Sequence, residues 1–124
     1  MKINKIDYPV PLSNIADIEN DNIDVFIELD DGFQYNMLVV TPQNLNWLMD
    51  KENMNYLPAG VPFIVVKTLT EENIRNAIES YLEDDGYWLK LYQLAGERFG
   101  LLSIKEMDEM LLKLKKENEE LYKE

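Results

Sequence analysis

The sequence contains no cysteine and no histidine. Disulfide bonds and zinc–thiolate sites are therefore excluded, and so is any catalysis that needs a cysteine nucleophile or a histidine base. The lack of cysteine is in keeping with a reducing compartment. The N-terminal region has no apolar run of signal-peptide length, and no window of the sequence approaches a transmembrane span. We therefore expect a soluble cytoplasmic protein that makes no contact with membranes.

Basic residues are also scarce, with 12 Lys and Arg against 24 Asp and Glu and a formal net charge of −12. No basic residue lies between Lys5 and Lys51, whereas the acidic residues of this region are Asp7, Asp17, Glu19, Asp21, Asp24, Glu28, Asp30, Asp31 and Asp50. Such a surface repels nucleic-acid phosphates and attracts cationic surfaces. The charge predicts a basic protein partner and no nucleic-acid ligand, with simple solubility as the alternative explanation.

The 124 residues, 46% hydrophobic and 29% charged, suit one folded domain spanning 1–124. Apolar and polar residues alternate from Ile23 to Leu29 and again from Phe33 to Val39, which predicts two half-buried strands. Asp30-Asp31-Gly32 lies between them and supplies a hairpin turn. The apolar run from Phe63 to Val66 predicts a third strand, buried on both faces.

Helix starts are predicted at Thr41-Pro42, at Thr70 and at Ser103, because Thr and Ser cap free amides and Pro suits the first helical position. Ser103 with Glu106 also forms a capping-box pattern. Asp84-Asp85-Gly86 interrupts the second helix, and Gly96 and Gly100 mark its end. The expected fold is therefore α+β, with the order β-β-α-β-α-α. A hairpin and a third strand form a small antiparallel sheet that carries helices on one face.

The last helix carries an apolar stripe of Met107, Met110, Leu111, Leu114 and Leu121. Its first half is apolar enough to pack on the domain, whereas residues 116–124 are charged and are expected to project or fray. Asn118 and the charges after Lys115 dilute the stripe, which argues against self-association through this helix.

Four acidic residues in and before the first predicted strand match part of the spacing of a calcium-binding loop. Asp17, Glu19, Asp21 and Glu28 fall at positions 1, 3, 5 and 12 of an EF-hand loop. The sixth position is Asn22 rather than Gly, and Glu28 lies in a strand pattern, so we expect a solvated loop without metal. The Asp30-Asp31-Gly32 segment likewise serves as a turn, because no Lys or Arg lies nearby to hold a phosphate. We expect neither catalysis nor a cofactor.

Aromatic residues gather near the hairpin and near the interruption of the second helix. We expect Tyr81 and Trp88 to pack in the core, while other Tyr and Trp residues are suited to anchoring a protein partner. The candidate partner-binding residues are Asp17, Glu19, Asp21, Asp24, Glu28, Asp30, Asp31, Tyr35, Trp47, Tyr87 and Tyr92.

The hairpin "IDVFIELDDGFQYNMLVVTP", the unit "GVPFIVVKTLTEENIRNAI" and the surplus of acids resemble the small acidic immunity proteins of bacterial polymorphic and contact-dependent toxin systems. The resemblance is one of profile over the first hundred residues, and it implies a protein that binds and neutralises a toxin domain, often a nuclease. The leading hypothesis is thus a non-enzymatic acidic protein-binding domain for a basic toxin domain. The alternatives are a structural or regulatory subunit that assembles through its C-terminal helix, and a metal-dependent enzyme that uses the carboxylates from Asp17 to Asp31.

Overall fold

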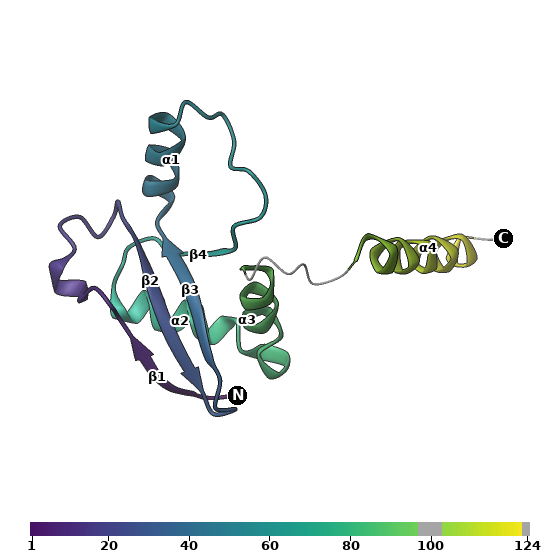
Figure 1. Cartoon of the computed structure of the whole chain (residues 1–124), viewed down its shortest axis with the longest axis horizontal. Coiled ribbons are helices and arrows are strands. Elements are labelled where there is room, and N and C mark those ends of the chain that lie inside the picture. The colour runs from purple at the N-terminus through teal and green to yellow at the C-terminus, as the bar shows by residue number, and fades with distance from the viewer. Residues whose placement is uncertain (97–102, 123–124) are drawn as a thin grey trace.

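The structure is a computed structural model that describes residues 1–96 and 103–122 (Figure 1). The elements in chain order are β1 (Ile3–Asp7), the short 3-10 helix η1 (Leu12–Asn14), β2 (Asn22–Leu29), β3 (Gln34–Val40), α1 (Pro42–Lys51), β4 (Phe63–Val65), α2 (Glu71–Ser80), α3 (Glu83–Gly96) and α4 (Ile104–Leu121). The expected α+β fold is confirmed, and β2 to α3 follow the expected order.

The four strands form one mixed sheet in the order β1-β2-β3-β4. The β1–β2 and β2–β3 pairs are antiparallel, as expected for the hairpin, but β4 pairs with β3 in parallel. The antiparallel expectation therefore fails for the third predicted strand. The segment from α1 to residue 62 forms a crossover that brings the chain back beside Leu38, so that β4 runs in the same direction as the last three residues of β3.

Strands β2 and β3 direct their odd-numbered residues to one face, here called the inner face. Ile27, Leu29 and Val39 are fully buried there. Ile74 and Ile78 of α2 and Leu89 of α3 belong to the same core, so these two helices cover the inner face (Figure 1). The period-two pattern thus predicted the buried face correctly.

The even-numbered residues lie on the opposite, outer face, where Asp24, Glu28 and Asn36 are exposed. The register places Phe63 of β4 beside Leu38, so both belong to this face. Helix α1 and residues 54–61 share a cavity with these two residues. Only α2 and α3 therefore follow the expectation of helices on one face.

Strand β4 lies at the edge of the sheet rather than in its interior. Ile64 is buried on the inner face, whereas Val65 is 47% exposed. Burial of this segment on both faces was therefore predicted wrongly.

The predicted helix starts are confirmed by their caps. The side chains of Thr41, Thr70 and Ser103 accept the backbone N–H groups of Asn44, Asn73 and Glu106 at 3.2, 3.1 and 3.1 Å. The interruption at Asp84-Asp85-Gly86 is also confirmed, since these residues have φ angles of 53°, 58° and 74°. Of the two glycines expected to end α3, Gly96 is its last residue and Gly100 lies outside the described residues.

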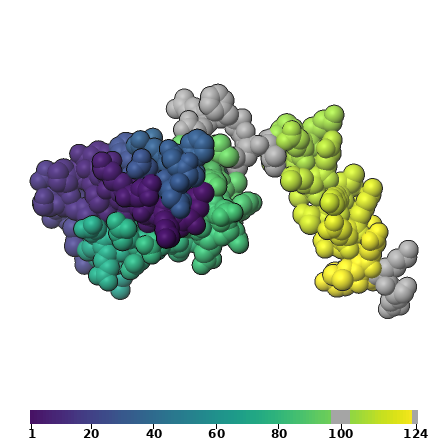
Figure 2. Space-filling model, turned by 90° about the horizontal axis from the view of Figure 1, so that it is seen from below, coloured from purple at the N-terminus to yellow at the C-terminus, as the bar shows by residue number. Residues whose placement is uncertain are grey.

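Every residue from Ser103 to Tyr122 is exposed, so α4 buries nothing against residues 1–96. Figure 2 shows this helix, in yellow, standing clear of the body that contains the sheet. The expectation that its first half packs on the domain is therefore wrong. The helix remains regular to Leu121, through most of the charged segment that was expected to project or fray. Among the described helices, none combines the length and the hydropathy that crossing a bilayer would need.

Candidate functional site

A cleft of about 450 Å³ opens beside β3, between the outer face of the sheet and the end of α3. The strands supply its floor, the segment before β4 supplies one wall, and the last turns of α3 supply the other. The residues that line it are Asp24, Asn36, Met37, Leu38, Gly60, Val61, Pro62, Tyr92, Gln93, Ala95 and Gly96. Its volume falls within the range of ligand-binding clefts in proteins.

The cleft exists because β4 is shorter than β3. The three residues of β4 pair with Leu38 to Val40 and leave the preceding part of the β3 edge without a neighbouring strand. Helix α3 approaches this open edge, where the Gln93 side-chain oxygen accepts the Asn36 backbone N–H at 2.7 Å. The edge is thereby held at a fixed distance from the helix, and the remaining space forms the cleft.

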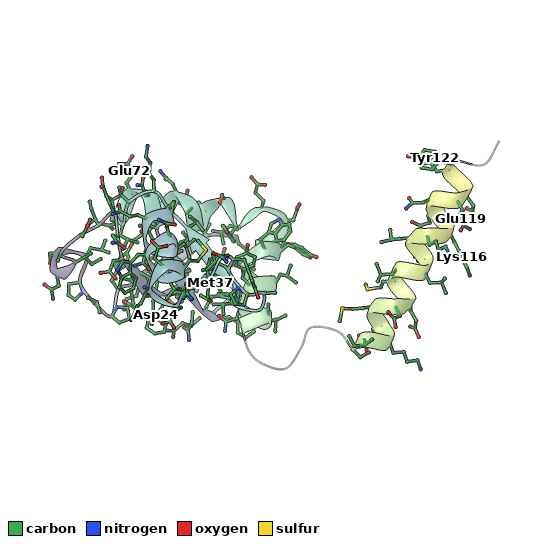
Figure 3. The ribbon with its side chains drawn as sticks, turned by 90° about the horizontal axis from the view of Figure 1, so that it is seen from above. Asp24, Met37, Glu72, Lys116, Glu119 and Tyr122 are labelled. Carbon is green, nitrogen blue, oxygen red and sulfur yellow. The ribbon has the colours of Figure 1, made fainter. Side chains whose placement is uncertain are left out.

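Asp24 is the one charged residue among the described residues that line the cleft. It lies opposite Leu38 in the β2–β3 register, so a carboxylate stands directly beside an apolar side chain. Figure 3 labels Asp24 on β2 and Met37 on the neighbouring strand β3, where Asp24 is exposed on the outer face and Met37 belongs to the core on the inner face. A carboxylate beside an apolar side chain can receive a long cationic side chain, whose stem packs while its head pairs with the acid.

The outer face continues this acidic character along β2 and β1. Glu28 is exposed on β2, and the register places Lys5 of β1 opposite it. The Lys5 Nζ lies 3.3 Å from an Asp7 carboxylate oxygen, and both side chains are more than half exposed. Lys5 therefore neutralises one acid of this face and leaves Asp24 and Glu28 in excess.

Tyr92 forms part of the wall on α3 and is half-buried. Its ring meets that of Tyr81 edge to face, with centroids 5.1 Å apart. Burial, together with the hydrogen bond to Tyr92, raises the pKa of Tyr81 to about 12. This edge-to-face contact orients the Tyr92 ring at the wall of the cleft.

The acidic residues predicted to bind a partner do not form one cluster. Asp17, Glu19 and Asp21 precede β2, whereas Asp30 and Asp31 follow it, at the other end of an eight-residue strand. This strand separates the two groups by roughly 25 Å. Only Asp24 and Glu28 lie between them on the outer face.

The loop before β2 is held by a chain of amide side chains. The Asn44 amide nitrogen donates to the Asn20 side-chain oxygen at 3.1 Å, and its oxygen accepts from the Asn22 amide at 2.9 Å. Asp17 and Asp21 each accept a nearby backbone N–H, at 3.0 and 2.7 Å. These bonds suit a structural loop, and no three carboxylates of the described residues are grouped as a metal site would require.

The Asp31 side chain in the hairpin turn also makes hydrogen bonds to nearby residues. Asp31 accepts the Phe33 backbone N–H at 2.9 Å and the Tyr35 hydroxyl at 2.8 Å. These bonds, that of Phe33 foremost, hold the pKa of Asp31 below its ordinary value. Burial and the bond to Asp31 raise the pKa of Tyr35 to about 12.

Tyr35 is a correction to the predicted binding residues. Its side chain is only 6% exposed and belongs to the core, because odd-numbered residues of β3 point to the inner face. Its hydroxyl is committed to Asp31. Tyr35 therefore offers no surface to a partner.

Trp47 and Tyr87 are exposed, as an anchoring role would need, but both lie outside the cleft. The Lys51 Nζ lies 5.0 Å from the Trp47 ring centroid, so this ring already makes a cation–π contact within the chain. Tyr87 meets Trp88 edge to face, with ring centroids 5.5 Å apart. Trp88 is 51% exposed, so the expectation that it packs in the core is wrong.

Reasoning from the sequence missed most of the cleft, including Asn36, Leu38, Val61 and Pro62. One signal was present, since Leu38 is an apolar residue on the polar face of its strand. An apolar residue at this position also fits a strand in the interior of a sheet, so the pattern alone does not specify a cleft. The wall residues before β4 carry no comparable pattern.

A second, smaller cavity of about 260 Å³ lies between α1, the following loop and the outer face. Its lining is mostly apolar and includes Leu45, Leu48, Leu57 and Phe63. Asn44 lies at its polar end, but both ends of that amide are already hydrogen-bonded. The Asn44 amide is therefore already engaged within the protein and is not available to orient a ligand in this cavity.

Comparison with known proteins adds no relative. No family model, no curated protein and no solved structure matches the chain.

Proposed function

We propose that the protein is a non-enzymatic binding domain whose acidic outer face and adjoining cleft engage basic side chains of a protein partner. The observation that carries the proposal is the cleft, where the Asp24 carboxylate lies in a lining that is part apolar and part polar and that contains no lysine or arginine among its described residues. A lysine or arginine side chain matches this arrangement in shape and in charge.

We propose a non-enzymatic role because the residues that line the cleft do not supply the groups that catalysis usually needs. General acid–base catalysis usually needs two groups held at different protonation states, and Asp24 is the one carboxylate among the described lining residues. Tyr92, the other ionisable group there, packs against Tyr81. The chain as a whole supplies no histidine or cysteine.

The resemblance to immunity proteins favours a toxin domain as the partner, and the net charge of −12 favours a basic one. Opposite charges across an interface mainly raise the association rate and select the partner. In this role the protein would act in the cytoplasm, by covering the basic surface with which a nuclease holds nucleic acid.

Calorimetric titration with an unstructured peptide rich in arginine and lysine tests the proposal. We expect saturable binding that weakens as salt is raised, because salt screens exposed charges. Asp24→Asn should weaken it about two- to fivefold, the value of one partly exposed ion pair. The matched control is Asp50→Asn, which removes the same charge from an exposed position on α1. Equal effects of the two substitutions would show that only net charge matters and would refute the cleft.

A second candidate function is a structural or regulatory subunit that assembles through its C-terminal helix. One observation favours it, namely that α4 exposes every apolar side chain of its stripe. The two functions use different parts of the chain and can coexist in one protein.

A further inference from the structure

Helix α4 presents an unpartnered apolar surface. Its exposed large apolar side chains, with Tyr122 just beyond its end, are Ile104, Met107, Met110, Leu111, Leu112, Leu114, Leu121 and Tyr122. Apolar side chains aligned on a solvent-exposed helix mark an interaction site, because soluble proteins rarely leave such surfaces open to water.

The spacing of these residues specifies the kind of partner. When Ile104 is taken as position a of a heptad, the a and d positions along the helix are Ile104, Met107, Leu111, Leu114, Asn118 and Leu121. Apolar residues at alternating spacings of three and four form the seam of a coiled coil. The face of α4 therefore fits another helix of the same repeat rather than a sheet or a pocket.

Asn118 occupies an a position, and this residue points to a second copy of the chain. In a parallel pair in register, each Asn118 lies opposite Asn118 of the second copy, where the two amides can hydrogen-bond. A single asparagine at an a position is a known device that sets the register and number of strands in parallel coiled coils. Leucine at the d positions Leu114 and Leu121 also suits two strands.

The antiparallel arrangement is less favourable. It would place Asn118 opposite Met107, twice in each dimer, and would bury amides without partners. It would gain pairs between Asp108 and Lys115 at the exposed margins of the seam. Exposed ion pairs contribute less than unpaired buried amides cost, so the parallel arrangement prevails.

The positions that flank the seam raise no objection to parallel pairing. In register, Met110 at position g meets Lys115 at position e, and Glu117 meets Tyr122. No like charges face each other at these contacts, although the chain as a whole is strongly acidic.

We infer that α4 pairs with α4 of a second copy as a parallel two-stranded coiled coil, with Asn118 against Asn118 at the axis. This gives the second candidate function its partner and makes no use of the cleft. It also reverses the interpretation of Asn118, which counted against self-association when the stripe was expected to pack on the domain. Because α4 spans only 18 residues, the dimer should be weak and concentration-dependent.

Two leucines of the same helix give a matched test. Leu112 and Leu114 are each 53% exposed in the single chain, but only Leu114 lies on the seam. In sedimentation equilibrium of the full chain, Leu114→Glu should raise the dimer dissociation constant at least about tenfold. Leu112→Glu should change it by less than about twofold. Equal effects of the two substitutions, or a wild-type chain that stays monomeric up to millimolar concentration, would overturn the inference.

The orientation can be tested by oxidation, because the natural chain has no cysteine. In a parallel pair, Ile104→Cys and Leu121→Cys should each form a disulfide-linked homodimer when oxidised alone. Lys116→Cys, on the opposite side of the helix, should not cross-link. Disulfides that form only when the Ile104→Cys and Leu121→Cys chains are mixed would show antiparallel pairing and overturn the assigned orientation. Peptide binding at Asp24 is measured independently of these two tests. The coiled-coil proposal can therefore be refuted while the peptide-binding proposal stands, and the reverse.

Discussion

The side-chain oxygen of Gln93 on α3 accepts the backbone N–H of Asn36 on β3, at 2.7 Å and across 57 residues of sequence. This bond satisfies a strand edge that β4 is too short to reach, and it sets the width of the cleft. An unpaired strand edge invites pairing with other chains, so its closure by a side chain also protects the monomer.

Replacing Gln93 should therefore loosen this edge. We expect Gln93→Ala to speed hydrogen exchange of the Asn36 amide about two- to tenfold, the net value of one hydrogen bond. Gln43→Ala, at an exposed position of α1, serves as the control and should leave that exchange unchanged. If Asn36 exchanged at the wild-type rate in Gln93→Ala, the cleft would be held by other contacts.

Asn44 is expected to matter for stability more than its size suggests. It is 7% exposed, and its side chain bonds both Asn20 and Asn22. Asn44→Ala should lower the free energy of unfolding by about 1–3 kcal/mol, because the two hydrogen bonds of the buried Asn44 amide are lost. Asn46→Ala on the same helix is exposed and should change it by less than about 0.5 kcal/mol. Denaturant unfolding of the two variants would compare them directly, and equal midpoints would contradict the role of Asn44.

The Asp31–Tyr35 hydrogen bond predicts two limbs in the pH dependence of stability. The pKa of Asp31 is lowered, so its contribution is present above the ordinary pKa of an aspartate and is lost as pH falls through the lowered value. The pKa of Tyr35 is raised to about 12, so its contribution is complete below about pH 10 and is lost as pH rises from there to about 12.

Tyr35→Phe removes one of these bonds and keeps the buried ring. We expect NMR titration to show a higher Asp31 pKa in this variant, although still a lowered one, because the Phe33 N–H remains. An unchanged Asp31 pKa would show that the hydroxyl does not reach this carboxylate in solution.

The sequence pattern predicted those parts of the fold that depend on local chemistry. The caps at Thr41, Thr70 and Ser103 and the interruption at Asp84 to Gly86 require only neighbouring residues, and all are confirmed. The inner face of the β2–β3 hairpin was also recognisable, because period-two alternation depends on burial of one face.

Features that depend on distant contacts were not predictable in this way. Strand β1 has no regular alternation, since the register shifts between Ile3 and Lys5, and it went unrecognised. The parallel pairing of β4 depends on the path of the crossover, which no local pattern encodes. The cleft joins residues from β2, β3, the loop before β4 and α3, so only the assembled fold brings them together.

The apolar stripe of α4 likewise does not predict whether this helix packs on its own domain or on another chain. Since the core residues of the described part of the chain all lie within residues 1–96, we expect deletion of residues 103–124 to shift the melting temperature by less than ~2 °C. The comparison should use concentrations at which the full chain is monomeric, so that dimer formation does not contribute. Aggregation of the shortened chain, or a loss of many degrees, would show that α4 does cover the core.

The central claim is that a basic partner binds at the cleft around Asp24. Its most direct test is to map the backbone amide shifts of the chain during titration with the arginine- and lysine-rich peptide. We predict saturable shifts concentrated at Asp24, Asn36, Leu38 and Val61, with little change in the loop from Asp17 to Asp21. Shifts confined to that loop or to Asp30 and Asp31, or shifts that do not saturate, would contradict it.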